Sequence, residues 1–268
     1  MRGGEVFGFN GQMKSTELGS GIYTAKFWEY DSRIGRRWNS DPVVKPWQSG
    51  YLCFSGNPIY RVDINGDDDY TVDQKGNISL LKKTKDKTDK LISLGKNGKI
   101  DFKQDGTLKD KSIIVDKGIL NQKNHQEIDY DNNLCHDKIV RDWYEIKSQD
   151  DNKSLTLFKF LSQNTQVEWN LTQGNDKKGD GFSILTTTHN EGSVASTNLL
   201  YWYIDSKGYS PRKDYHNHPS GDGTPSGSYG DEGYAKELQK RFSKVKFNIY
   251  TSQDNKMNPY AIIKPKKK

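Results

Sequence analysis

The chain has little cysteine, no long apolar run and no apolar leader. Its two cysteines, Cys53 and Cys135, lie far apart and outside any Cys-x-x-Cys pattern, which excludes a disulfide framework and a cysteine-based zinc site. No apolar run approaches the roughly 18 residues that a membrane-spanning helix needs. Residues 1–5 carry no signal-peptide segment, so export would require another machine or a longer parent chain.

Apolar residues are scarce as well, at 32% of the chain, and the mean hydropathy is −0.96. A core must therefore be concentrated in parts of the 268 residues, which have room for one large or two small domains. Six tryptophans, fifteen tyrosines and ten phenylalanines exclude a chain that is disordered throughout. The formal charge of +6 gives a weak attraction to anionic surfaces. Residues 264–268 supply much of that charge and are interpreted as a solvated tail, so no specific nucleic-acid partner is expected.

Three regions differ in composition, and together they predict a multi-domain chain of the α+β or α/β class. Residues 1–66 are dense in glycine, aromatic residues and arginine, with short β-like runs. Residues 67–150 are polar, with recurrent glycine turns between short runs typical of strands at 78–81, 99–102 and 112–115. This middle region carries no recognisable chemistry and is interpreted as a β-rich hairpin connector.

Residues 151–268 have the pattern of a compact α/β domain. We expect a helix that is capped by Asp231 or Ser228 and continues to about Phe242. Residues 199–205 are either a buried strand or a short helix, and residues 215–218 form an extended edge. Further strands are expected at 155–161, 165–171, 181–188, 244–250 and 260–263.

The most informative motif of the chain lies between residues 216 and 231. His216 and His218 are two residues apart, so both imidazoles of an extended segment share one face and can reach one ion. A turn rich in proline, glycine and serine follows, and Asp231 returns as a possible third ligand. Imidazole and carboxylate favour Zn²⁺, and three protein ligands leave a fourth position open, as in catalytic zinc sites. The hydroxyl of Ser226 or Ser228 could stabilise charge on a carbonyl oxygen.

The N-terminal region resembles a known family through four segments, residues 8–12, 17–23, 30–42 and 54–59. These segments closely resemble the Rhs repeat-associated core, the C-terminal end of the YD-repeat shell of Rhs polymorphic toxins. The resemblance implies a core that encloses the toxin following it. The family's cleavage motif ends in Asp-Pro-x-Gly, whereas residues 63–66 lack the proline, which puts self-cleavage in doubt. About sixty residues cannot close a shell, so the chain is interpreted as a fragment, an orphan cassette or a truncated reading of a longer gene.

The C-terminal motif resembles a second family, the JAB/JAMM metalloproteases, in the form found in JAB-like toxin domains. The resemblance covers about the last 115 residues, but only residues 216–231 are specific. It implies a cytidine-deaminase-like α/β fold, Zn²⁺, and peptidase or isopeptidase (deubiquitinase-like) activity. The family spacing is seven residues between the second histidine and the serine, then two before the aspartate. Ser226 keeps the first spacing and Ser228 the second, as expected from a two-residue insertion; Ser228 is slightly favoured.

The resemblance also implies a general base on an upstream strand. Glu168 is the favoured residue, because it interrupts an apolar strand between Val167 and Trp169. Glu191 is the rival, but it follows His189 in a segment expected to be a surface turn. Two further carboxylates are kept as alternatives near the ligands, Asp222 in the loop and Asp214 on the face of His216.

The sequence therefore leaves three functions open. The first is an Rhs-type effector fragment with a zinc-dependent JAB-like peptidase, made in the bacterial cytoplasm and exported, with a protein substrate in a target cell and a cognate immunity protein. The second is a metal-dependent nuclease toxin, although nucleases of the His-Asn-His type take these residues from separate elements. The third is a non-catalytic binding or decoy effector.

Overall fold

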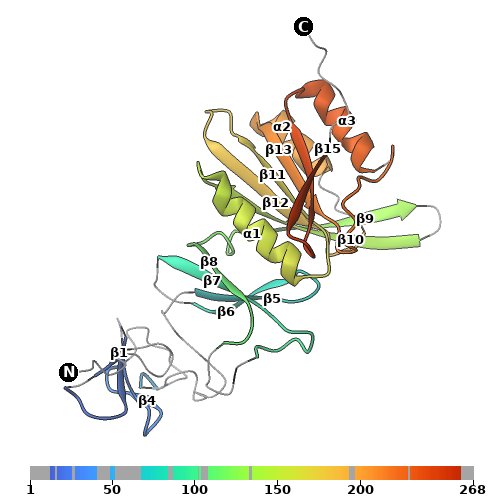
Figure 1. Ribbon diagram of the computed structural model, residues 1–268. Helices are drawn as coiled ribbons and strands as arrows, with labels where there is room; N and C mark the ends of the chain where they lie inside the picture. Colours follow the sequence, from blue (N-terminus) through green and yellow to red (C-terminus); the bar gives the residue numbers. More distant parts are fainter. Residues whose placement is uncertain are drawn as a thin grey trace.

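The structure is a computed structural model (Figure 1). It describes residues 13–15, 17–25, 28–40, 49–51, 68–83, 87–101, 103, 108–132, 135–192, 197–228 and 230–260. Residues 8–12, 54–59 and 63–66, on which much of the Rhs resemblance depends, lie outside the described residues, as do residues 261–263 of the last expected strand. Within the described residues, no helix is long and apolar enough to cross a membrane.

A seven-stranded mixed sheet forms the centre of the C-terminal part (Figure 1). The strand order is β15-β14-β13-β11-β12-β10-β9, in which β13 and β14 are parallel and the other neighbours antiparallel. The strands are β9 (Asn124–Asn132), β10 (Cys135–Lys147), β11 (Trp169–Asn175), β12 (Gly181–Thr187), β13 (Ser210–Asn217), β14 (Lys246–Thr251) and β15 (Lys256–Tyr260).

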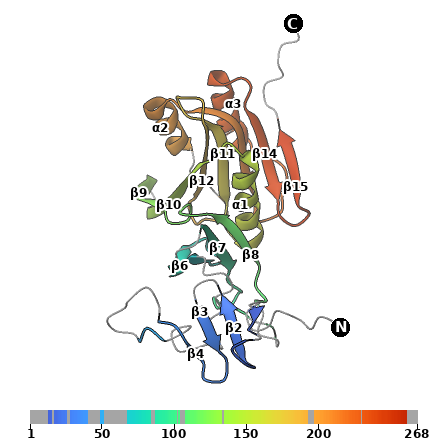
Figure 2. The ribbon, with the colours of Figure 1, turned by 90° about the vertical axis from the view of Figure 1, so that its left-hand side faces the viewer.

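Helices cover both faces of this sheet (Figure 2). Helix α1 (Asp151–Asn164) packs on one face through a core that includes Phe158, Trp169 and Tyr250. Helices α2 (Thr197–Lys207) and α3 (Asp231–Arg241) pack on the other through a second core cluster. Successive side chains of a strand point to opposite faces, so a single strand contributes residues to both core clusters. The sheet is therefore buried on both sides, as a three-layer α/β arrangement requires.

The expected strand at 155–161 is wrong, because these residues lie in α1. The Asp150 side chain caps the helix by accepting a hydrogen bond from the Asn152 N–H at 2.8 Å. The buried residues Leu157, Phe158 and Leu161 follow the spacing of a helix face, not a strand. For residues 199–205 the structure selects the helical alternative, α2.

The segment that carries the two histidines is not an edge, contrary to expectation. Residues 215–217 belong to β13, which lies in the interior of the sheet between β11 and β14, and His218 follows that strand directly. The sheet also crosses the expected boundary at residue 150, since β9 and β10 come from the predicted connector and pair with each other and with β12. Strand β13 is thus hydrogen-bonded to a neighbouring strand on each side, which fixes its position.

A second sheet of four strands packs into the same core as α1. Its order is β6-β5-β7-β8, and Val72 and Leu91 from this sheet join the cluster of Phe158 and Trp169. Residues 99–101, expected in a strand, lie outside one, and Phe102 is outside the described residues. The strands are β5 (Asp68–Val72), β6 (Ile78–Lys82), β7 (Thr88–Ser93) and β8 (Ser112–Asp116).

The described residues nearest the N-terminus form a separate four-stranded antiparallel sheet. Ile22 and Tyr30 are its buried apolar residues, and Asp31 is held by the Arg33 guanidinium at 2.7 Å. The strands are β1 (Met13–Lys14), β2 (Ile22–Ala25), β3 (Trp28–Asp31) and β4 (Arg36–Arg37).

Candidate metal centre

Three potential ligands meet where β13 ends and α3 begins. His216 lies in β13, paired with Asn170 of β11 and Ile249 of β14, and His218 follows directly after the strand. Asp231 is the first residue of α3. The chain thus runs from a central strand through a loop into a helix N-terminus and back into the parallel strand β14. Sites in α/β sheets commonly form at this carboxyl end of a strand.

The donor atoms of the three side chains lie close enough together to share one metal ion, with a different Asp231 oxygen nearest to each histidine. The Nε2 atoms of His216 and His218 are 3.1 Å apart. The Asp231 carboxylate oxygens lie 3.3 Å from His216 Nε2 and 3.4 Å from His218 Nε2. Ligand bonds of about 2.0–2.1 Å in a tetrahedron imply ligand separations of about 3.3 Å. The donor set and its spacing therefore fit a metal ion, and these residues could hold one together.

The loop between strand and helix orients His218. The carbonyl oxygen of Asp222 lies 2.9 Å from His218 Nδ1, which fixes the proton on Nδ1 and leaves Nε2 free as a ligand. The carboxylate of Asp222 accepts hydrogen bonds from the Thr224 N–H and hydroxyl instead. Asp222, an alternative ligand in the sequence analysis, thus contributes its backbone.

Asp231 is held by a reciprocal pair of hydrogen bonds with Ser226. The Asp231 N–H donates to Ser226 Oγ at 2.8 Å, and the Ser226 N–H donates to the Asp231 carboxylate at 2.8 Å. The residue at the helix N-cap position is Gly230, which has no side chain to cap the helix. The expectation that Asp231 or Ser228 is the cap is therefore wrong. A Cβ at Gly230 would lie 2.0 Å from Ser226 Oγ, so glycine is needed for this approach. Ser228 is exposed.

Electrostatics within the cluster favour an ionised Asp231. Burial opposes its ionisation, but hydrogen bonds from His216 and His218 outweigh that effect and lower the pKa of the carboxyl. The hydrogen bond to Asp231, partly offset by burial, raises the pKa of His218. The metal-free cluster therefore attracts cations, either protons or a metal ion.

Glu168 lies directly before β11 and is only 8% exposed. Burial raises its pKa to about 7, an effect opposed by the nearby His216 and His218 and reinforced by Asp231. All three ligands therefore act electrostatically on this carboxyl. A carboxyl with a pKa near neutrality can both accept and release a proton at physiological pH.

Asn217, which the sequence did not single out, joins the main chain on either side of Glu168 to strand β13. Its Oδ1 accepts the Trp169 N–H at 2.8 Å, and its Nδ2 donates to the Val167 carbonyl at 3.2 Å. These hydrogen bonds bracket Glu168 on both sides, and Asn217 is 1% exposed. Its position between the two histidines was the available signal, because alternation in a strand turns it to the opposite face.

The second sheet contacts Gln166 and Val167, the residues that precede Glu168. The turn between β5 and β6 presents the Gln74 carbonyl, which accepts the Gln166 N–H at 2.8 Å. Gly76 in this turn has φ +76°, and a Cβ there would lie 2.8 Å from Val167 Cγ2. The Glu168 N–H donates to the Asn190 carbonyl at 2.8 Å. Backbone groups from distant segments thus fix the main chain around Glu168.

His189 and Glu191 differ from each other in their surroundings. His189 was expected on the surface, but its ring nitrogens lie 2.7 Å from the Lys75 carbonyl and 3.1 Å from the Asp142 carboxylate. Its side chain is 14% exposed, so that expectation is wrong. Glu191, the rival base, is exposed.

Asp214 lies on the face of His216, as expected, but serves as an anchor in the protein interior. Its carboxylate accepts hydrogen bonds from Asn170, Thr172 and Tyr234 at 3.0, 2.7 and 3.1 Å. Tyr234 belongs to α3, so this contact ties the helix that presents Asp231 to the strand that presents the histidines. The group of possible ligands among the described residues does not include Asp214.

Comparison with known sequences identifies one family. Residues 146–239 match the model of the family described as JAB-like toxin 1. No curated protein and no solved structure matches the chain. The matched segment contains Glu168, both histidines and Asp231, and it supports the prediction of a JAB-like toxin domain. Strands β14 and β15 and the whole second sheet lie outside the matched residues.

Proposed function

We propose that this JAB-like domain is a zinc-dependent hydrolase of peptide or isopeptide bonds. The observation that carries the proposal is the triangle of His216, His218 and Asp231 donor atoms beside a buried carboxyl, Glu168, whose pKa is about 7. Two imidazoles and one carboxylate are a ligand set typical of catalytic zinc with an open position.

A bound zinc ion would supply Lewis-acid activation of water and of the substrate carbonyl. Glu168 would accept the proton of the attacking water and pass it to the leaving nitrogen. Its pKa suits both steps, because the carboxyl is only partly ionised near pH 7. Asn217 would hold the Glu168 main chain in place during both transfers.

Ser226 is the better placed of the two candidate serines. Its oxygen accepts the Asp231 N–H, which leaves its hydroxyl hydrogen available to donate to a developing oxyanion. Both serines are exposed, and the hydrogen bonds of Ser226 with Asp231 are what separates them, so we assign Ser228 no role in the reaction. This assignment reverses the slight preference for Ser228 that followed from spacing alone.

The biological setting is part of the proposal. We propose an Rhs-type effector fragment, with residues 1–66 as the end of an Rhs core. The toxin domain follows the predicted connector but also takes β9 and β10 from it, so it begins before residue 151. Export, a protein substrate in a target cell and a cognate immunity protein follow from that class. The JAB-like toxin match supports a toxin role, and the four N-terminal segments support the Rhs origin.

A cleavage assay with the full chain tests the activity. Fluorogenic peptides and an isopeptide-linked ubiquitin dimer are incubated with the parent and with Glu168→Gln. We expect EDTA-sensitive cleavage by the parent and a loss of at least about 100-fold in kcat for the variant, which retains its zinc. EDTA-sensitive cleavage of DNA or RNA without proteolysis would instead select the nuclease function, and zinc binding without hydrolysis would select the binding module.

A further inference from the structure

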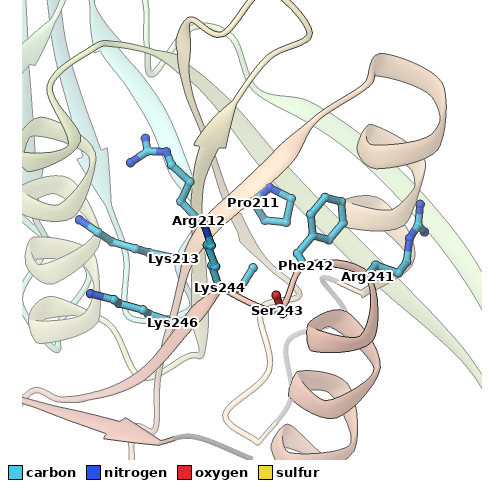
Figure 3. A pocket seen from close by; sticks show the side chains of 9 residues that line it. Pro211, Arg212, Lys213, Arg241, Phe242, Ser243, Lys244 and Lys246 are labelled. Carbon is cyan, nitrogen blue, oxygen red and sulfur yellow. The ribbon is translucent and has the colours of Figure 1, made fainter. Parts of the chain in front are cut away.

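A basic hollow lies where β13 begins, whereas the metal centre lies where that strand ends. Figure 3 shows the side chains that line the hollow. The hollow has a volume of about 580 Å³ and is formed where β13 and β14 begin and α3 ends. Five of the nine residues that line it are cationic and none is acidic. These are Arg212, Lys213, Arg241, Lys244 and Lys246, together with Pro211, Phe242, Ser243 and Val245.

The strand register concentrates positive charge at this hollow. Lys213 and Lys246 are direct neighbours on the parallel strands β13 and β14, and their side chains extend to the same side (Figure 3). Lys244 precedes Lys246 by two residues. Like charges on adjacent positions repel each other, so an anion bound between them would be favoured.

The protein's own carboxylates neutralise only part of this charge. Asp151 contacts Arg212 at 3.0 Å and Lys213 at 3.4 Å, and Asp205 contacts Arg241 at 2.6 Å. Within the described residues, Lys244 and Lys246 have no carboxylate partner. Two exposed ammonium groups therefore remain available at the hollow.

The surroundings favour a polypeptide over a nucleic acid. Single-stranded nucleic acids bind through aromatic rings on which bases stack. The one aromatic ring of the hollow, Phe242, is covered by the Arg241 guanidinium at 5.8 Å from its centroid. The five cationic residues are confined to one end of the sheet, whereas a phosphate backbone needs an extended basic track. Carboxylates are the groups that these arginines and lysines already bind within the chain.

We propose that this hollow is a docking site for an acidic segment of a partner protein, whose carboxylates pair with Lys244 and Lys246. The distance from Arg212 to His218 along β13 is roughly 20 Å. A partner bound here therefore leaves the metal ligands in place, and the site is independent of the proposed hydrolysis.

A fluorescence anisotropy titration tests the site. The probe is a labelled ten-residue peptide of alternating glutamate and leucine, added to the metal-free full chain at low and at physiological salt. We expect saturable, salt-sensitive binding that weakens at least roughly tenfold in the Lys244→Glu/Lys246→Glu variant. The matched control is Lys96→Glu/Lys99→Glu, which makes the same charge change at an exposed turn of the second sheet.

Three outcomes overturn the proposal. Equal weakening in both variants would mean that net charge alone attracts the probe. Tighter binding of a single-stranded oligonucleotide, lost with the same substitutions, would make the hollow a nucleic-acid site. If the parent does not bind the probe, although its circular dichroism and melting match those of both variants, the hollow does not have this role. The Lys244→Gln/Lys246→Gln variant removes the two charges without reversing them, and we expect it to give an intermediate affinity. That result would show that the loss of binding in the glutamate variant is not caused by misfolding.

Discussion

At the residue scale, the site depends on a carboxyl group that burial keeps partly protonated. The pKa of Glu168 is raised from 4.5 to about 7, so its protonated form is favoured in the folded protein. Its contribution to stability is fully present below its unfolded pKa of about 4.5 and is lost as the pH rises through about 7. In the metal-free protein above pH 7, ionised Glu168 is therefore a buried charge.

Replacing this group should change the pH dependence of stability. For metal-free Glu168→Gln at pH 8, we expect a higher free energy of unfolding than for the parent, by an amount of the order of 3 kcal/mol. At pH 4 the two proteins should differ much less, because the carboxyl is then neutral. Urea unfolding with chelator at both pH values measures this difference. Parallel pH profiles for the two proteins would contradict the raised pKa.

Asn217 offers a second prediction at this scale. Asn217→Ala removes both hydrogen bonds that bracket Glu168, and we expect kcat to fall by about 100-fold while KM changes little. Asn217→Asp keeps the acceptor for the Trp169 N–H and should retain more activity than the alanine variant. Zinc content is the control, since none of these contacts involves a ligand atom. Loss of zinc in step with kcat would assign Asn217 to folding alone.

At the element scale, the start of α3 positions Asp231, the third potential ligand. Ser226→Ala removes the acceptor for the Asp231 N–H, with an expected cost of about 1 kcal/mol in stability and weaker zinc binding. At saturating zinc, kcat should still fall about 100-fold if the hydroxyl stabilises the oxyanion. Ser228→Ala is the matched control and should leave thermal stability, zinc affinity and kcat close to those of the parent. The reverse order of effects would restore Ser228 as the functional serine.

The elements show which patterns could be predicted from the sequence. His216 and His218 were predictable, because strand alternation alone puts both on one face. The strand at 181–188 was predicted and is β12. Residues 155–161 were not predicted correctly, because alternating leucines and phenylalanines fit a strand as well as one face of a helix. The cap at Asp150, five residues before the apolar run begins at Leu155, decides for the helix.

At the scale of the whole molecule, the supports of the site come from distant parts of the chain. Asn217 is fifty residues from Val167, and Gln74 is ninety residues from Asn164, whose carbonyl it also contacts. Local periodicity holds no information about such contacts. The ligands of the candidate site could therefore be predicted from sequence, whereas the residues that position its base could not.

Truncation tests this dependence on distant segments. A fragment of residues 151–268 loses β9 and β10, and with them the core residues Tyr144 and Ile146 and one of the two partners of β12. We expect it to be poorly folded, whereas residues 68–268 should melt cooperatively, because they keep both sheets of the common core. Circular dichroism and thermal melting compare the two. A cooperative transition for the shorter fragment would show that the domain begins at residue 151 after all.

The central claim is that His216, His218 and Asp231 form a zinc site. Elemental analysis of the purified full chain, after incubation with zinc and desalting, measures metal per chain directly. We expect close to one zinc per chain in the parent and in the control Asp222→Asn, whose backbone contact to His218 is retained, and almost none in His216→Ala/His218→Ala. A folded parent without zinc, or a double variant that retains it, would contradict the account.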